Sequence, residues 1–181
     1  MGGVLMTYGE EIKKAMNMLA KEKNTIFLGQ QVVFPGSIMS KSLDDVPMTK
    51  RIELPLIEDC QMGMSIGLSL DGHLPISIYP RMDFLIIAMN QLANHLDKIE
   101  EMSCGQFKPK VIIRTAIGST KPLYPGLQHC SDYTMAFKKM FKNIKVKKIW
   151  FADQVMEFYK EALESKHSTI LIEVADLYGE K

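Results

Sequence analysis

The strongest constraint on this chain is the regular alternation of short, continuous apolar runs with segments of helical spacing. The runs predict strands at Thr25–Leu28, Arg51–Ile57, Leu74–Tyr79, Lys110–Thr115, Lys145–Phe151 and Thr169–Val174. Within them the apolar residues follow one another without alternation, which is typical of parallel sheets covered on both faces. The pattern predicts an α/β fold, with a doubly wound, mainly parallel sheet and helices on both faces, in a single domain over residues 1–181.

Segments of helical spacing connect these runs. Helices are predicted at residues 8–21, 58–70, 82–102, 131–140 and 153–165. The first begins with a capping box, in which Thr7 is the N-cap and Glu10 reaches back to it. Residues 30–50 show no clear period, which predicts a long loop, and loops of that length are usually functional.

The charge balance excludes several classes of partner. The formal net charge is +1, from 22 basic and 21 acidic residues, so nothing favours nucleic acid or an anionic membrane. No apolar run approaches the ~18 residues that cross a bilayer, and the N-terminal residues lack the regions of a signal peptide. Three cysteines without CxxC spacing predict neither a disulfide framework nor structural zinc. We therefore expect a reduced, cytoplasmic protein.

Two adjacent carboxylates, Glu58 and Asp59, occupy a strand-to-helix junction. They follow the predicted strand 51–57, which should be buried, and they open a helix rich in small residues. Ligands of open α/β sheets bind beyond the carboxyl ends of the strands, so Glu58 is a candidate for catalysis or ligand binding. The alternative is that both carboxylates only stabilise the helix, since a helix N-terminus favours negative charge.

His129 is the second candidate. It follows a Gly- and Pro-rich loop and precedes a predicted helix, at the same expected edge of the sheet. The other histidines, His73, His95 and His167, fall in a turn, within a helix and before the last strand. His129 is therefore the histidine placed for chemistry. A solvated loop residue, or a metal or thiolate site together with Cys130, are the alternatives.

The order of these motifs resembles the pyrimidine-binding domain of the beta subunits of 2-oxo acid dehydrogenases and, more loosely, the equivalent transketolase domain. The resemblance extends from Thr7 to Gly179. Its motifs are a Pro-x-x-Glu segment, helix glycines, an aromatic stretch, a long helix and a Gly-rich loop ending in histidine. In this sequence they are Arg51–Glu58, Gly63, Gly67, Gly72, Tyr79–Phe84, Asn90–Asn94, Met102–Gln106, Val111–Arg114, His129 and Ile170–Gly179. Each motif is weak alone, but their common order and spacing are specific.

The resemblance implies thiamine diphosphate as the cofactor and assigns Glu58 to its aminopyrimidine ring. In such enzymes a glutamic acid at this place shares a proton with the ring nitrogen opposite the amino group. This favours the imino tautomer, which removes the proton from the thiazolium carbon and gives the nucleophilic ylid, and the cofactor does the remaining chemistry. Glu58 is thus implied to be both catalytic and cofactor-binding.

Four further positions take roles from the resemblance. Phe84 matches an aromatic residue that stacks on the pyrimidine, although a place in the helix core would also explain it. His129 matches a histidine that faces the reacting substrate or acyl intermediate, which implies a catalytic and substrate-binding role. Ile57 and Met62 correspond to wall residues of the cofactor pocket.

The chain departs from the family pattern at informative places. The usual Gln-Phe-Ala-Asp is Pro80–Asp83 here, and Arg81 is a candidate contact for a substrate carboxylate or phosphate. The Gly-Asp-Gly motif that anchors the diphosphate through Mg²⁺ is missing, because Leu70–Gly72 reads Leu-Asp-Gly. The diphosphate and Mg²⁺ are therefore expected on a partner, an alpha-like subunit. The C-terminal domain of such beta subunits would begin where this chain stops.

These implications predict the pyrimidine-side subunit of a two-chain enzyme that decarboxylates a 2-oxo acid and transfers the acyl or aldehyde unit. It would be active only with its partner, as a homodimer or a heterotetramer, because the cofactor must bridge two domains. Two alternatives stay open: a split transketolase-like or carboligase subunit, and a non-catalytic homologue that stabilises a partner. Glu58 argues against the last, because an idle domain needs no acid there.

Overall fold

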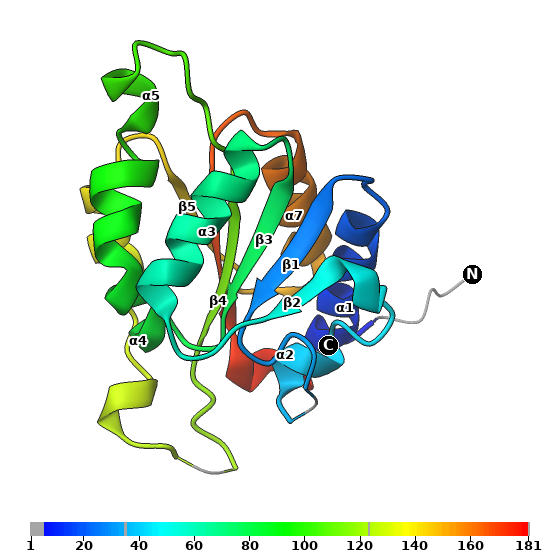
Figure 1. Ribbon diagram of the computed structural model, residues 1–181. Coiled ribbons are helices and arrows are strands. Elements are labelled where there is room, and N and C mark those ends of the chain that lie inside the picture. Colours follow the sequence, from blue (N-terminus) through cyan, green and yellow to red (C-terminus); the bar gives the residue numbers. More distant parts are fainter. Residues whose placement is uncertain (1–5, 35, 123, 181) are drawn as a thin grey trace.

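Six parallel strands form one sheet in the order β2-β1-β3-β4-β6-β5 (Figure 1). They are β1 (Thr25–Gly29), β2 (Arg51–Glu53), β3 (Leu74–Tyr79), β4 (Ile112–Ile117), β5 (Lys145–Lys148) and β6 (Thr169–Val174). This computed structural model describes residues 6–34, 36–122 and 124–180, so the expectation about a signal peptide lies largely outside the described residues. The predicted parallel α/β sheet is confirmed.

Helices cover both faces of the sheet (Figure 1). On one face α1 (Tyr8–Ala20) and α7 (Ala152–Glu164) pack against each other and enclose the first apolar core. On the other face α3 (Glu58–Leu70), the helical segment 82–102 and α6 (Thr134–Met140) enclose the second. Within the described residues, no helix is long and apolar enough to span a membrane.

The central strands contribute side chains to both cores. In β4, Ile112 and Ala116 belong to the first core, whereas Ile113 and Ile117 belong to the second. Because successive residues of a strand point to opposite faces, a strand covered on both sides can carry apolar side chains on both faces. This explains the continuous apolar runs of the sequence.

The predicted helix 82–102 is wrong in detail. It is divided into α4 (Met82–Leu85), a 3-10 turn (Ile86–Ala88), a π-helix (Gln91–Leu96) and α5 (Ile99–Met102). The Asp97 N–H donates to the Leu92 carbonyl, five residues back, at 2.9 Å. The Asp97 carboxylate in turn accepts the backbone N–H groups of residues 142–144. A contact with a distant segment thus accompanies the local winding, which sequence periodicity does not encode.

Other element boundaries also differ from the prediction. The predicted loop 30–50 contains α2 (Ile38–Lys41) and a 3-10 turn (Met48–Lys50). The strands predicted to reach Ile57 and Phe151 end earlier, at Glu53 and Lys148. β2 lies at the edge of the sheet and pairs only with β1, whose last residue is opposite Glu53, so the ladder stops there. Two further 3-10 turns are Leu127–His129 and Ala175–Leu177.

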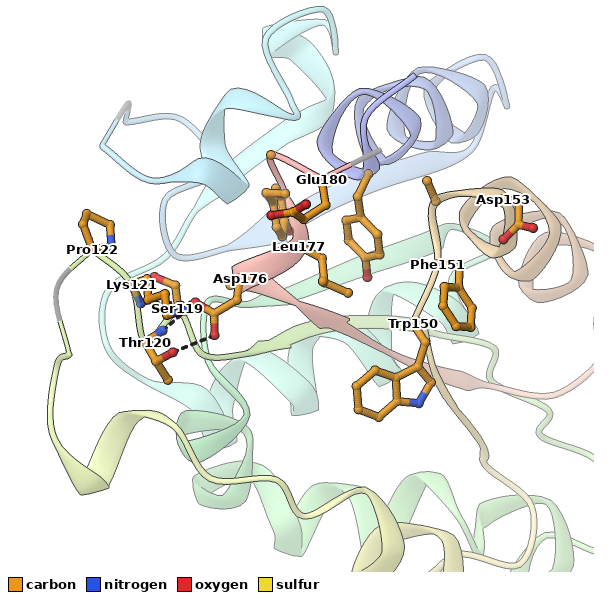
Figure 2. Close-up of a pocket in the computed structure, with 15 residues that line it drawn as sticks. Ser119, Thr120, Lys121, Pro122, Trp150, Phe151, Asp153, Asp176, Leu177 and Glu180 are labelled. Carbon is orange, nitrogen blue, oxygen red and sulfur yellow. Dashed lines mark hydrogen bonds between the residues drawn. The ribbon is translucent and has the colours of Figure 1, made fainter. Parts of the chain in front are cut away.

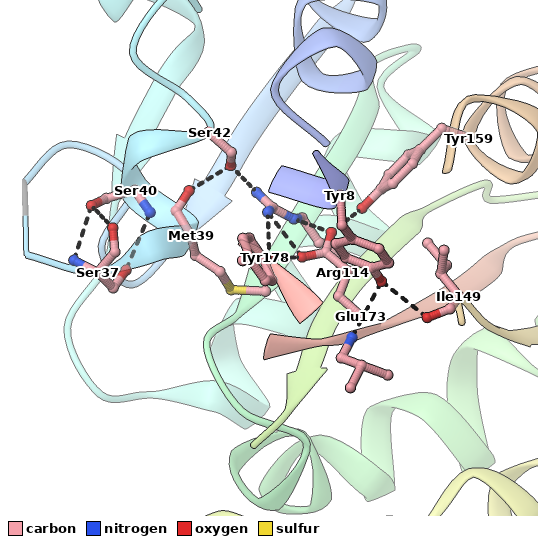
Figure 3. A network of polar contacts seen from close by, with 11 residues as sticks. Tyr8, Ser37, Met39, Ser40, Ser42, Arg114, Ile149, Tyr159, Glu173 and Tyr178 are labelled. Carbon is pink, nitrogen blue, oxygen red and sulfur yellow. Dashed lines mark hydrogen bonds and ion pairs between the residues drawn. The ribbon is translucent and has the colours of Figure 1, made fainter. Parts of the chain in front are cut away.

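A buried ion pair ties β4 to β6 (Figure 3). Arg114 and Glu173 are both fully buried, and Arg114 Nε donates to Glu173 Oε1 at 2.6 Å. The hydroxyls of Tyr159 and Tyr178 also donate to this carboxylate, while Arg114 Nη1 donates to Ser42 Oγ at 2.8 Å. Burial opposes the charge of Arg114, but Glu173 and the tyrosines hold the pKa of the guanidinium above its ordinary value. Burial and then the charge of Glu173 raise the pKa of both tyrosines, which therefore stay donors.

The first and last elements meet at the surface next to this network. The N–H of Tyr8 donates to the carbonyl of Glu180 at 2.7 Å, and the N–H of Gly9 donates to that of Tyr178 at 3.1 Å. A Cβ on Gly9 would lie 2.8 Å from the Tyr178 carbonyl oxygen, which explains the glycine. The N-terminal helix is thereby fixed to the segment after β6.

Candidate functional site

Three strands, β2, β3 and β4, deliver the predicted site residues to one edge of the sheet. Glu58 follows β2, Arg81 and Phe84 follow β3, and His129 ends the long connection after β4. Because parallel strands end at the same edge, residues far apart in the sequence are gathered there. In Figure 1 the connection after β4, in yellow-green, extends beyond this edge.

Glu58 is a buried carboxylate at the first position of α3, with 5% of its surface exposed. Its Oε1 accepts a hydrogen bond from Gln30 Nε2 at 2.9 Å. Within the described residues, Oε2 accepts no hydrogen bond and is not an enclosed atom. The backbone carbonyl of Glu58 accepts the hydroxyl of Tyr79 at 3.2 Å, which ties α3 to the end of β3. A buried acid with one unclaimed oxygen can accept a hydrogen bond from a ligand.

Two backbone features place Gln30 beside Glu58. Gly29 has φ +144°, and a Cβ there would lie 2.1 Å from the Ile78 carbonyl oxygen, so only glycine fits. The N–H groups of residues 31–33 then donate to the Glu53 carboxylate at distances of 2.7–2.8 Å. The end of β2 therefore fixes the loop after β1, and Gln30 is held with 7% of its surface exposed.

The segment that leads to Glu58 differs from the prediction. The strand expected to be buried as far as Ile57 ends at Glu53, and residues 55–57 are exposed, with Leu56 77% exposed. The neighbouring Asp59 accepts a hydrogen bond from Gln91 Nε2 at 3.1 Å. Both acids lie in the first turn of α3, so stabilisation of the helix N-terminus is compatible with a further role for Glu58.

His129 and Phe84 are in contact. Their ring centroids are 5.6 Å apart and the rings are nearly perpendicular, at 88°. His129 Nδ1 is buried and, among the described residues, has no hydrogen-bond partner. Buried polar atoms are rarely left unpaired, so a bound group is an obvious candidate for the missing partner.

Arg81 holds the connection that carries His129. Its Nη1 donates to the carbonyl of Gly118 at 2.6 Å and to that of His129 at 2.8 Å, which joins the two ends of this long loop. The Asp83 carboxylate accepts the N–H of Ser131 at 3.3 Å. Arg81 therefore positions the loop through Nη1. That its other nitrogens contact a carboxylate or phosphate of the substrate stays a prediction.

Three further residues show how far the sequence predicts the lining of the site. Ile57 is 38% exposed beside Glu58, as a wall residue would be. Met62 is fully buried in the second core, so its place in this structure is a packing position. Gln30 is missed by the sequence reasoning, although a polar residue directly after a strand at the carboxyl edge is a signal that the sequence contains.

A cavity of about 920 Å³ lies beyond β4, β6 and β5, and none of the predicted site residues lines it. In Figure 2 the loop with Thr120 faces Trp150 and Phe151 across it. The Asp176 carboxylate accepts the Thr120 N–H at 2.7 Å and its hydroxyl at 2.9 Å, and the Lys121 N–H at 3.2 Å. The predicted site residues thus lie outside this cavity.

We compared the sequence of the chain with those of known proteins. No protein-family model matches the chain. It is 26% identical to the mitochondrial beta subunit of the pyruvate dehydrogenase E1 component of Ascaris suum, over 99% of this chain and 50% of that protein. It is 27% identical to the chloroplastic beta-3 subunit from Oryza sativa subsp. japonica, over 99% and 46%. The chain is related to the beta subunits of pyruvate dehydrogenase E1. It spans about half the length of these relatives.

Solved structures share the fold. The structure described as "Split gene transketolase, inactive beta4 tetramer" matches with a TM-score of 0.72 and 18% identity, over 94% of this chain and 52% of that one. The transketolase of Campylobacter jejuni subsp. jejuni NCTC 11168 matches with a TM-score of 0.71 and 12% identity, over 97% and 27%. The transketolase-like fold expected from the resemblance is therefore confirmed.

Proposed function

We propose that the chain is the pyrimidine-side subunit of a two-chain, thiamine diphosphate-dependent enzyme. The observation that carries the proposal is the Glu58 carboxyl, which is buried at the carboxyl edge of the sheet and whose Oε2 has no hydrogen-bond partner among the described residues. The relationship to pyruvate dehydrogenase E1 beta subunits supports the cofactor class and the two-chain organisation.

The residues present fit an aminopyrimidine ring. Glu58 Oε2 is available to a ring nitrogen, and the ring of Phe84 lies at the same edge in contact with His129. His129 Nδ1 is buried without a partner among the described residues, which suits a group that gains one on binding. A flat apolar ring bearing polar nitrogens complements this combination of an aromatic face and unpaired polar atoms.

The diphosphate end of the cofactor does not fit this chain. Asp71 and Gly72 connect α3 to the beginning of β3, so they lie at the opposite edge of the sheet from Glu58. Among the described residues, no group of three His, Cys, Asp or Glu side chains could hold a metal ion. We infer that an alpha-like partner holds the diphosphate and Mg²⁺.

The side chains divide the work at the proposed site. Thiamine diphosphate, when bound, supplies a carbon nucleophile for the substrate carbonyl. Glu58 Oε2 gives and takes the proton at the ring nitrogen, and Phe84 limits the position of the ring. His129 faces the substrate and can move a proton through Nδ1. Arg81 keeps His129 in place, and those of its nitrogens without a partner among the described residues are candidates for a substrate carboxylate or phosphate.

The proposed reaction is decarboxylation of a 2-oxo acid and transfer of the acyl or aldehyde unit, which the names of the sequence relatives favour. The second candidate is a split transketolase-like or carboligase subunit, which the similarity to the structure described as a split gene transketolase favours. A non-catalytic, partner-stabilising role is disfavoured by the buried acid at Glu58.

Calorimetric titration with thiamine diphosphate and Mg²⁺ tests the two-chain proposal. The isolated chain should bind negligibly, because the metal-bound diphosphate supplies most of the anchoring. The complex co-purified from the native host should bind the cofactor and turn over one member of a panel of 2-oxo acids. Tight binding by the isolated chain would contradict the two-chain organisation. A complex that binds but turns over only sugar phosphates would favour the transketolase-like candidate.

A further inference from the structure

The hydrogen bond from Gln30 differentiates the two oxygens of Glu58. Gln30 Nε2 donates to Oε1 at 2.9 Å, while Oε2 has no partner among the described residues. We propose that Gln30 is a positioning residue that holds Oε1 as a permanent acceptor, so that Oε2 is the oxygen that carries the exchangeable proton. This inference rests on the proposed function and specifies which atom of Glu58 performs it.

The direction of the hydrogen bond follows from the chemistry of the amide. A glutamine NH₂ group donates and cannot accept, and it does not titrate in the range in which a carboxyl does. A proton on Oε1 would make this oxygen a weaker acceptor for the amide, which is unfavourable. A proton taken up by Glu58 therefore resides on Oε2, which is the oxygen open to a ligand.

The same donor is directed at one oxygen of the carboxyl, Oε1. A hydrogen bond to the charged form of an acid stabilises that form against the neutral one. Gln30 therefore occupies Oε1 and leaves Oε2 as the atom through which a proton can be exchanged with the ring nitrogen.

Gln30 is fixed independently of Glu58, as a positioning residue must be. Its backbone follows Gly29, which only glycine can occupy beside the Ile78 carbonyl, and it precedes the three N–H groups held by Glu53. The backbone of the loop therefore fixes the position of the Gln30 side chain, and the hydrogen bond to Glu58 is not needed to hold it there. The next residue, Gln31, is exposed and uses its backbone N–H at Glu53, so its side chain provides a matched control.

The first test uses the isolated chain and needs no cofactor. The ionisation of Glu58 is followed by ¹³C NMR of its side-chain carboxyl, assigned by its loss in Glu58→Gln. Gln30→Met keeps the length of the side chain but removes the donor, and it should move the titration midpoint upward by about one pH unit. The Gln31→Met control should leave the midpoint unchanged.

An isosteric variant guards against misfolding of Gln30→Met. Gln30→Glu keeps the shape but places two carboxyls within hydrogen-bond distance, so they should share a proton and titrate in two separate steps. A single, unmoved midpoint in both variants would overturn the proposal. So would an upward shift in Gln31→Met as large as in Gln30→Met.

The second test uses the complex reconstituted with the partner. The rate of hydrogen–deuterium exchange at the thiazolium carbon is measured against pH, and its acid limb should shift upward by about one pH unit in Gln30→Met. An unmoved acid limb would overturn the role in catalysis. If no complex of the wild-type chain exchanges this proton, the proposed function fails, whereas the NMR result still decides the hydrogen bond.

Discussion

Glu58, at the start of α3, and Glu173, in β6, are two buried glutamates with opposite surroundings. Glu173 is fully buried and accepts hydrogen bonds from Arg114, Tyr159 and Tyr178 (Figure 3). Glu58 is 5% exposed and accepts only the Gln30 amide from the described residues. Both oxygens of Glu173 accept hydrogen bonds from this chain, whereas only Oε1 of Glu58 does so among the described residues.

The difference separates stability from function. A buried charge without partners is unfavourable, and the fold compensates fully for Glu173 with a cation and two hydroxyl donors. Glu58 has no cation and no hydroxyl donor among the described residues, so this chain offsets only part of the free-energy cost of burying its carboxylate. Places where a fold leaves a local rule unsatisfied are often functional sites. The contrast leads to four predictions, from the largest expected effect to the smallest.

Replacing Glu58 should affect chemistry and not folding. In the complex with its partner, Glu58→Gln should slow exchange of the proton on the thiazolium carbon by about 10²–10⁴-fold, because a positioned acid–base group is lost. Hydrogen–deuterium exchange of the bound cofactor measures this rate. The unfolding midpoint of the isolated variant serves as the control and should stay close to that of the unchanged chain. An unchanged exchange rate would exclude Glu58 from the reaction.

Replacing Glu173 should affect folding and not chemistry. Glu173→Gln leaves Arg114 charged and buried without a counter-ion, which should lower the free energy of unfolding by about 3–5 kcal/mol. Urea denaturation of the isolated chain, followed by circular dichroism, measures this loss. Glu58→Gln under the same conditions is the matched comparison. Equal losses in the two variants would show that the distinction between the two acids is wrong.

His129 should act on the substrate after the cofactor is bound. His129→Ala should lower turnover of the complex by about 10²-fold, a typical value for the loss of a general acid or base. The affinity for thiamine diphosphate should stay nearly unchanged. Turnover at saturating cofactor and calorimetric affinity separate the two effects. A collapse in affinity with normal turnover at saturation would place His129 in the cofactor pocket or the fold.

The smallest effect concerns the cavity on the other half of the edge. Partial burial opposes ionisation of Asp176, but the hydrogen bonds from Thr120 and Lys121 hold the pKa of this carboxyl below its ordinary value. A carboxyl whose pKa is lower in the folded state than in the unfolded state stabilises the fold at any pH above its ordinary, unfolded-state pKa. This stabilisation is lost as the pH falls through the folded-state pKa. The hold on the loop should therefore weaken below about pH 4.

Trp150, the single tryptophan, lines the same cavity and reports this change by its fluorescence. Asp176→Asn should remove much of the acid step in emission, whereas Asp153→Asn, an exposed carboxyl of the same cavity, should retain it. An acid step that is identical in both variants would assign it to other groups.

The sequence predicts the features that follow from its regular pattern of apolar runs and helical spacing. The order of strands and helices follows from the apolar runs, and the place of Glu58 follows from the rule that parallel strands end at one edge. The winding of residues 82–102 is not predictable in this way, because Asp97 is engaged by residues 142–144, which are distant in the sequence. The hold of Arg81 on the carbonyls of Gly118 and His129 is hidden for the same reason.

The backbone bonds from Tyr8 and Gly9 to Glu180 and Tyr178 have a mechanical consequence. Chain ends normally fray independently of the body of a domain. Here the start of α1 and the segment after β6 hold each other, so neither can separate without breaking these bonds. A force that separated these two segments would act on these backbone bonds before it acted on the sheet.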